Sequence, residues 1–249
     1  MQRISFMNEQ WLNKKVAFIG DSITDKIHVG TTRNYWDYLA ESCGIVPLVY
    51  GINGSQWDGV IPQAEKLIAE HGTDIDAIFV FLGTNDYNHS IPLGVWYDYR
   101  EEETNYHGVM KKAMRRYFNT SASTLRGRIN AGLGFLKKHF PLQQIILMTP
   151  VHRGFACFSE TNVQPEESFP NELERYVADY IACIREAGDI WSVPVIDLYS
   201  DSGLFPMMDE YAQYFHLADT DRLHPNAAGH QRIAETIRYK IQTLPATFR

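Results

Sequence analysis

Three short motifs place small and polar residues directly after apolar runs that are typical of buried strands. They are Gly20-Asp21-Ser22, Asn53-Gly54-Ser55 and Gly83-Thr84-Asn85-Asp86. Because the carboxyl ends of neighbouring parallel strands line one crevice, we expect these residues to lie close together. A serine at such a strand end is exposed and held by rigid backbone. Ser22 therefore suits a nucleophile, and it equally suits a hydroxyl that binds phosphate.

A fourth motif, Asp221-Arg222-Leu223-His224, precedes the last helical pattern of the chain. Acyl transfer needs a nucleophile, a base for its proton, a group that orients the base, and donors for the oxyanion. We expect Ser22 to attack and His224 to take its proton, then to give that proton to the leaving group. We expect Asp221 to accept the other imidazole N–H of His224.

Donors for an oxyanion are also present. We expect the backbone N–H groups of Ser22 and Gly54 and the side-chain amide of Asn85 to form the oxyanion hole. Gly54 suits this role because a residue without a Cβ lets substrate approach the backbone closely. The same glycine-rich turns would also suit a non-catalytic module that binds a phosphorylated ligand or a glycan. Such a module has no need for Asp221 and His224, and the Walker-type phosphate signature is absent.

The four motifs, in this order and across nearly the whole chain, resemble those of the SGNH hydrolases of the GDSL esterase/lipase superfamily. The letters S, G, N and H in the family name stand for one residue of each motif, and here they correspond to Ser22, Gly54, Asn85 and His224. The family's usual aspartate, three residues before the histidine, corresponds to Asp221. One departure is an asparagine before Gly54, where many members have serine. The resemblance implies hydrolysis of esters through an acyl-enzyme, without a metal or cofactor. It also implies a flavodoxin-like sheet of strand order 2-1-3-4-5.

Five apolar runs have the length and composition of strands that are buried on both faces. They are Val16–Ile19, Ile45–Tyr50, Ala77–Leu82, Ile145–Met148 and Val193–Ile196. Helical patterns lie between them. This alternation predicts an α/β fold, a three-layer sandwich in which a parallel sheet has helices on both faces. No repeat or linker interrupts it, so we expect one domain over residues 1–249.

Two segments, 87–123 and 151–170, are longer than ordinary connections and are typical of lids and binding walls. The first is too aromatic for a disordered segment. We expect it to pack with some helix around Gly108–Phe118, with Lys111, Lys112, Arg115 and Arg116 on a solvated helix face. Whether it is a lid or a structural element stays open.

Three residues are candidates for binding substrate. Trp57 and Trp96 could stack on a sugar or line an acyl site, and both could equally be core residues. His152 follows the fourth apolar run, at the edge of the sheet where the motifs gather. Among Trp57, Trp96 and Tyr97 we expect most to pack and one or two to contact substrate, and we take His152 as a further candidate whose alternative is an exposed loop residue.

The composition excludes several classes of protein. The net charge of −7 is unlike that of a general nucleic-acid binder, which needs a basic face. No run approaches the roughly 20 apolar residues of a membrane span. The scattered Cys43, Cys157 and Cys183 fit neither a disulfide framework nor a zinc site. The N-terminus lacks a hydrophobic signal region, as in a cytoplasmic protein or an exported one whose leader has been removed. The oligomeric state stays open.

Together these features predict a serine esterase that removes a short acyl group, most plausibly acetyl, from a carbohydrate or another small ester. The aromatic insertions and the family resemblance support this substrate. The alternative is a lysophospholipase or thioesterase with the same residues and a longer acyl chain.

Overall fold

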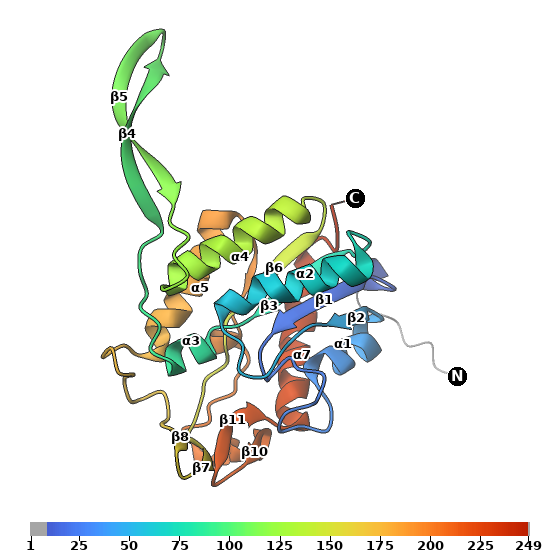
Figure 1. The fold of residues 1–249 in the computed structure, drawn as a ribbon. Helices are drawn as coiled ribbons and strands as arrows, with labels where there is room; N and C mark the ends of the chain where they lie inside the picture. Colours follow the sequence, from blue (N-terminus) through green and yellow to red (C-terminus); the bar gives the residue numbers. More distant parts are fainter. Residues whose placement is uncertain (1–8, 249) are drawn as a thin grey trace.

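The computed structural model describes residues 9–248, so the N-terminal segment on which the localisation depends lies outside the described residues. Five parallel strands form the central sheet, in the order β2-β1-β3-β6-β9 (Figure 1). They are β1 (Lys15–Gly20), β2 (Val46–Val49), β3 (Ala77–Phe81), β6 (Gln144–Met148) and β9 (Val195–Ile196). Counted along this sheet alone, the order is 2-1-3-4-5, which confirms the expected fold class.

Helices cover both faces of the sheet (Figure 1). On one face α2 (Val60–His71), α4 (Leu125–His139) and α5 (Val177–Trp191) share a core with Ala17 and Ile19 of β1. On the other face α1 (Tyr35–Cys43) and α7 (Ala227–Lys240) share a core with the alternate β1 residues. Successive side chains of a strand point to opposite faces, so a sheet covered on both sides needs continuous apolar runs.

Local signals in the sequence set the ends of α1. Asn34 accepts hydrogen bonds as its N-cap while Asp37 bonds back to the Asn34 backbone, and Gly44 ends the helix with a φ of 68°. The shorter helices are η1 (Glu9–Trp11), η2 (Trp57–Gly59), α3 (Thr84–Asn88), α6 (Leu198–Asp201), η3 (Asp209–Tyr214) and η4 (Ile241–Thr243). Asp197 caps α6, since its carboxylate accepts a hydrogen bond from the Ser200 N–H.

A second, small sheet lies beyond the carboxyl ends of the central strands (Figure 1). Its strands are β10 (Phe215–Leu217), β11 (Asp221–Pro225), β7 (Ala156–Ser159) and β8 (Asn162–Gln164), in that order. The long segment 151–170 therefore contains the β7–β8 hairpin, and β11 contains the Asp221–His224 motif. This small sheet brings both segments to one edge of the fold.

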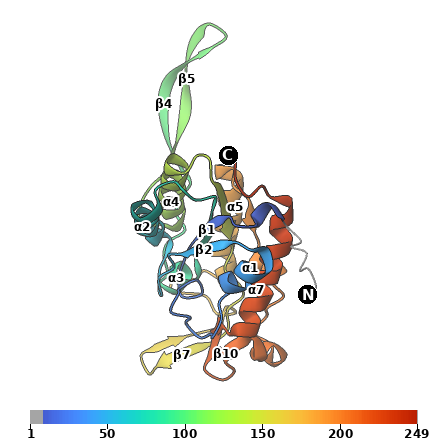
Figure 2. The same ribbon diagram turned by 90° about the vertical axis from the view of Figure 1, so that its right-hand side faces the viewer.

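The segment 87–123 differs from our expectation. Residues 97–118 form a β-hairpin of β4 (Tyr97–Tyr106) and β5 (Val109–Phe118), which projects from the body in both views (Figures 1 and 2). The helix expected around Gly108–Phe118 was wrong. His107 and Gly108 have φ values of 54° and 83°, which suit a two-residue hairpin turn, and cross-strand pairing outweighs the helix propensity of Lys, Arg and Met.

No helix within residues 9–248 is both long enough and apolar enough to cross a membrane.

Candidate active site

Ser22 lies directly after β1, in a turn that Asp21 holds together. The Asp21 carbonyl accepts hydrogen bonds from the N–H groups of Thr24 and Asp25, and its carboxylate accepts one from Ile23. These bonds turn the chain at the carboxyl edge of the sheet. Ser22 borders a cavity there, but the residue is only 5% exposed, so the expectation of an exposed serine was wrong.

A chain of hydrogen bonds joins Ser22 to His224 and Asp221. The Ser22 Oγ lies 3.0 Å from Nε2 of His224, and the His224 Nδ1 lies 3.0 Å from Oδ2 of Asp221. The backbone N–H groups of Leu223 and His224 donate to Oδ1 of Asp221. Because the Asp221 carboxylate can only accept, the Nδ1 of His224 carries hydrogen and its Nε2 can accept from Ser22.

Opposing effects act on the Asp221 carboxyl group. Burial raises its pKa, but the hydrogen bond and charge of His224, with a further bond from His216, outweigh that effect. The pKa of Asp221 therefore lies below its ordinary value. The group stays ionised and can stabilise an imidazolium.

Asn85 and Gly54 border the same cavity as Ser22. Asn85 lies in α3, and one hydrogen of its side-chain amide is donated to the Ser55 carbonyl at 3.0 Å. The amide nitrogen carries a second hydrogen, which is available for a ligand. Gly54 has a φ of 79°, in the left-handed region. The structure thus brings Ser22, Gly54, Asn85 and His224 to one cavity, with Asp221 behind His224.

The cavity has a volume of about 460 Å³ and a neutral, amide-rich wall. Its lining residues are Ser22, Val29, Asn53, Gly54, Asn85, Asn88, His89, Phe158, Asn162, Gln164, Leu223 and His224. None of these described residues is an aspartate, glutamate, lysine or arginine. The Phe158 ring lies 5.5 Å from the His224 ring, centroid to centroid, and is half-exposed.

Sequence reasoning missed the β7–β8 contribution to this wall. Phe158, Asn162 and Gln164 all come from that hairpin. The unusual length of segment 151–170 was the available signal, because it predicted a binding wall without identifying the residues. Asn88 and His89, which follow Asn85 in and after α3, were also missed.

The structure corrects the expected role of the two tryptophans. The Trp57 side chain is fully buried, and that of Trp96 is 7% exposed; both pack in the core on the α2, α4 and α5 side. The Trp96 carbonyl also accepts a hydrogen bond from Asn130, and the Arg126 guanidinium lies over the Trp96 ring. Neither tryptophan lines the cavity with Ser22, because α4 and the segments around it cover their rings.

His152 also lies away from the Ser22 cavity. Its imidazole is paired with the Glu167 carboxylate and lies 3.7 Å from the Tyr199 ring, centroid to centroid. These partners occupy the side chain, so the expectation that His152 contacts substrate is corrected too. The bonds tie the start of segment 151–170 to its end and to α6.

Two buried carboxyl groups flank the site. Burial raises the pKa of Asp21 to about 7, against the opposing effects of the Ile23 N–H and His224. Burial also raises the pKa of Asp86 to about 6, although Trp57 donates its backbone N–H and Arg128 lies 3.0 Å away. Asp86 thereby links α3, which carries Asn85, to the segment that follows Gly54.

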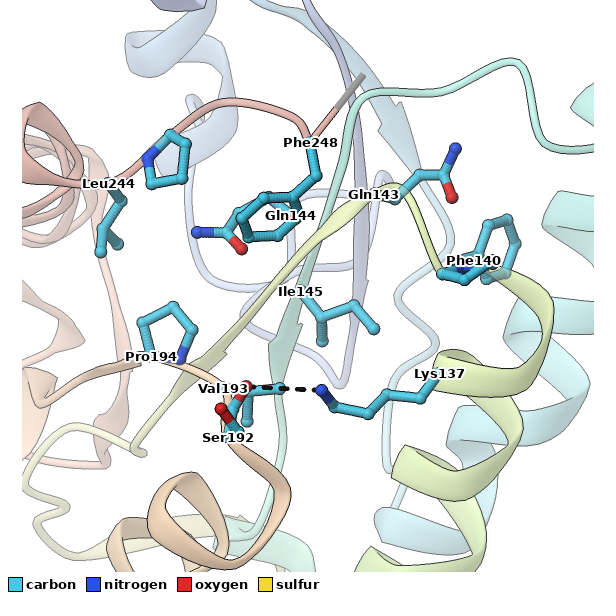
Figure 3. A pocket seen from close by; sticks show the side chains of 12 residues that line it. Lys137, Phe140, Gln143, Gln144, Ile145, Ser192, Val193, Pro194, Leu244 and Phe248 are labelled. Atoms are coloured by element: carbon cyan, nitrogen blue, oxygen red, sulfur yellow. Dashed lines mark hydrogen bonds between the residues drawn. The ribbon is translucent and has the colours of Figure 1, made fainter.

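A more apolar hollow of about 500 Å³ lies at the other end of the sheet strands (Figure 3). Phe140, Val193, Pro194 and Leu244 are among its lining residues, and the Lys137 amine donates to the Ser192 carbonyl at 3.4 Å. No histidine or cysteine lines it, and the Lys137 amine bonds the Ser192 backbone carbonyl and not its hydroxyl. Among the described residues, no group of three histidine, cysteine or carboxylate side chains could hold a metal ion.

Comparisons with known proteins place the chain among ester hydrolases. The sequence model of the GDSL-like lipase/acylhydrolase family matches residues 18–232. A crystal structure of a Lactobacillus plantarum protein is similar over 94% of this chain and 98% of that chain, with 26% identity and a TM-score of 0.73. Comparison with curated protein sequences gives no match.

Two further solved structures share the fold at lower identity. A possible lipase from Chitinophaga pinensis is 19% identical, with a TM-score of 0.69, over 93% of this chain and 99% of that chain. A catalytic mutant of an acetylxylan esterase from Geobacillus stearothermophilus is also 19% identical, with a TM-score of 0.56, over 92% and 94% of the two chains.

Proposed function

Because the chain belongs to the GDSL-like lipase/acylhydrolase family, whose members hydrolyse esters, we propose that it is a serine esterase with Ser22 as nucleophile. The observation that carries this proposal is the hydrogen-bonded chain from Ser22 through His224 to Asp221. A serine hydroxyl is a weak nucleophile at neutral pH, and a base within hydrogen-bond reach activates it. The backbone donors and amide beside Ser22 would bind the negative charge that develops.

The first half of the reaction forms the acyl-enzyme. His224 takes the Ser22 proton as Oγ attacks the ester carbonyl carbon. The Ser22 and Gly54 N–H groups and the free Asn85 amide hydrogen donate to the oxyanion. The intermediate collapses as the carbon–oxygen bond to the alcohol breaks, and His224 gives its proton to that alcohol.

The second half returns the enzyme to its starting state. His224 takes a proton from water, and the resulting hydroxide attacks the acyl carbon. The second intermediate collapses as the bond between the acyl carbon and Ser22 Oγ breaks. Ser22 Oγ recovers its proton from His224, and the carboxylic acid leaves. Asp221 remains ionised throughout and stabilises the imidazolium in both halves.

We propose that the substrate is a short acyl ester, in particular an acetyl ester, of a neutral carbohydrate. Amide side chains in the cavity wall offer paired donors and acceptors for sugar hydroxyls, and Phe158 offers a ring face. The side-chain amides of Asn53 and Asn88 make no hydrogen bond to the described residues and are thus available to a ligand. The acetylxylan esterase among the similar structures supports the same substrate class.

The proposed nucleophile is tested with Ser22→Ala, and Ser123→Ala serves as the control because Ser123 is exposed and outside the cavity. We expect Ser22→Ala to abolish turnover of a simple aryl acetate and labelling by a fluorophosphonate, with an unchanged melting temperature. Ser123→Ala should keep both activities. Full turnover by folded Ser22→Ala would overturn the serine mechanism.

The substrate is tested by comparing acetyl, octanoyl and palmitoyl esters, together with acetylated xylo-oligosaccharides. We expect the highest kcat/KM on acetyl esters. Phe158→Ala should raise KM for the acetylated sugar more than for ethyl acetate, which has no ring to stack. Preference for octanoyl or palmitoyl esters would instead support the lysophospholipase or thioesterase alternative and overturn the acetyl proposal.

A further inference from the structure

The β4–β5 hairpin, residues 97–118, extends away from the body as a two-stranded arm (Figures 1 and 2). Each strand has ten residues, so the arm is about 33 Å long at the usual rise of a strand. Among the described residues, neither strand pairs with a third strand. An isolated two-stranded hairpin is marginally stable in water, and an exposed arm of this length is expected to have a partner.

The root of the arm is fixed to the body. The Phe118 ring stacks on Trp191 at 4.3 Å, and the Trp191 indole donates to Asn130. The Asn130 amide in turn donates to the carbonyls of Trp96 and Asn119, on the two sides of the arm. These contacts fix the direction in which the arm leaves the body. Its outer part, by contrast, contacts only itself.

One face of the outer arm carries exposed apolar side chains. The strand register places Tyr99, Met110 and Met114 on the same face as Tyr97 and Phe118. Tyr99, Met110 and Met114 are 58%, 58% and 61% exposed. On β5 these apolar side chains alternate with the charged Lys112 and Arg116. Exposed apolar side chains of this size on one face are typical of a surface that another molecule covers.

Charges pair within the arm on both faces: the Lys112 amine lies 3.2 Å from the Glu101 carboxylate on the first face, and Glu102 is paired on the opposite face. Glu102 accepts from Arg115 at 3.1 Å and from the Tyr117 hydroxyl. The guanidinium groups of Arg100 and Arg115 lie over the Tyr117 ring. The exposed apolar residues of this opposite face are Tyr106 and Val109, which pair with each other at the tip. Most exposed apolar side chains of the arm therefore lie on the face with Tyr99, Met110 and Met114, which we call the apolar face.

The two strands carry opposite charge. β4 has four carboxylates and one arginine, whereas β5 has two lysines and two arginines and no acid. On the apolar face Glu101 and Glu103 lie on β4, opposite Met114 and Lys112 of β5. A partner of uniform charge, such as a nucleic acid or an anionic membrane, would be attracted by one strand and repelled by the other. A second copy of this arm offers both signs.

We propose that two copies of the chain associate through their arms. The apolar faces pack on each other, and the acidic β4 of each arm lies over the basic β5 of the second copy. Pairing of like strands edge to edge would set carboxylates against carboxylates or lysines against lysines, which destabilises a sheet. Packing face to face avoids this and uses the same surface on both copies, as a twofold dimer requires.

Light scattering on the full chain during size-exclusion chromatography tests this proposal, and sedimentation velocity provides the affinity. We expect a dimer in the micromolar range. Met110→Glu with Met114→Glu should give a monomer, because it places charges on the apolar face. Leu142→Glu, at an exposed apolar residue of the body, is the matched control and should leave the dimer intact. All variants should keep aryl acetate turnover, because the arm lies at the other end of the molecule from β11, the strand that carries Asp221 and His224 (Figure 1).

A pair of charge variants tests the arrangement of the strands. Glu101→Lys with Glu103→Lys makes the apolar face wholly basic, and Lys112→Glu with Arg116→Glu makes it wholly acidic. Each double variant alone should be a monomer, and a one-to-one mixture should form a dimer. A monomeric wild type across the micromolar range, dimers in either double variant alone, or a mixture that stays monomeric would overturn the proposal. So would a dimer that only Leu142→Glu disrupts.

Discussion

His216 shares the carboxylate of Asp221 with His224. The His216 Nδ1 lies 3.1 Å from Oδ2 of Asp221, and the same oxygen lies 3.0 Å from Nδ1 of His224. The β10–β11 pairing sets His216 there, since it pairs Leu217 with Asp221. The proposed orienting carboxylate is therefore itself held by a second imidazole, at the same oxygen that His224 bonds.

Loss of the His216 bond should weaken catalysis modestly. We expect His216→Ala to lower kcat/KM on an aryl acetate by about fivefold, because one hydrogen bond contributes roughly 1 kcal/mol. His216→Asn, whose amide can donate to Asp221, should recover most of that loss. Asp221→Ala is the reference for full loss of the orienting group and should cost much more. Equal rates for wild type and His216→Ala would show that His216 does not position Asp221.

Asn85 should contribute to transition-state stabilisation and little to ground-state binding. Asn85→Ala should lower kcat by about 10²–10³, the usual effect of removing one oxyanion donor, with KM nearly unchanged. Asn88→Ala, a neighbouring amide of the same wall, is the control and should affect KM for sugar esters instead. A fall in kcat of only a few-fold for Asn85→Ala would remove Asn85 from the oxyanion hole.

Gly54 should be needed for its backbone conformation. A Cβ at this position would meet nothing within 4 Å, but the φ of 79° is one that residues with a Cβ rarely adopt. Gly54→Ala should therefore cost about 1–2 kcal/mol of conformational free energy or shift the Gly54 N–H away from the substrate. We expect a large fall in kcat with a small fall in melting temperature. Unchanged kcat would show that the Gly54 N–H is not a donor to the oxyanion.

The sequence predicted the central sheet well because strands covered on both faces leave continuous apolar runs. The run before Ser22 and the one before Gly83 both correspond to such strands. Once these strands are parallel and adjacent, Ser22, Gly54 and Asn85 must approach one another. Fold and site were predictable together because one arrangement of strands determines both.

The remaining features depend on contacts that a single sequence does not display. The sequence does not distinguish an aromatic residue that stacks on a ligand from one that fills a core. Trp57 is of the second kind, because it packs in the core with α2 and α4. Local propensity favoured a helix near Gly108, but ten cross-strand residue pairs between β4 and β5 stabilise a hairpin there instead. The bond between His216 and Asp221 depends on the turn that joins β10 to β11. Phe158 faces His224 only through the β7–β11 pairing.

Arg128 should stabilise the protein by neutralising buried Asp86. The Asp86 side chain is fully buried, and removing one partner of a buried ion pair costs about 3–5 kcal/mol. We expect Arg128→Met to lower the free energy of unfolding by about 3–5 kcal/mol at pH 8. The pKa of Asp86 is already raised to about 6, and without Arg128 it should rise further. The loss should therefore be smaller at pH 5, where Asp86 binds a proton and no longer needs a counter-charge.

Chemical denaturation at the two pH values measures this effect. Arg115→Met is the control, because the Arg115–Glu102 pair is exposed and such pairs contribute roughly 0–1 kcal/mol. An equal loss of stability for Arg128→Met at pH 5 and pH 8 would contradict the explanation based on the charge of Asp86.

His230 should make the protein less stable in acid. Burial, followed by the charges of His224 and His28, lowers the pKa of His230 to about 3 from an ordinary 6.5. The unfolded chain therefore binds a proton at His230 that the folded protein excludes between these pH values. Above pH 6.5 His230 is neutral in both states and does not change the free energy of unfolding with pH. As the pH drops from 6.5 toward 3, proton binding at His230 in the unfolded chain lowers the free energy of unfolding by about 1.4 kcal/mol per pH unit.

His230→Gln should flatten this dependence. Its amide oxygen can still accept the Tyr35 N–H that now bonds Nδ1 of His230, but it takes up no proton in this range. We expect the free energy of unfolding of His230→Gln to fall less between pH 6.5 and pH 4.5 than that of wild type, by urea denaturation at each pH. His107→Asn, at an exposed turn, is the control and should follow the wild type. Parallel pH profiles for His230→Gln and wild type would show that His230 is not the group responsible.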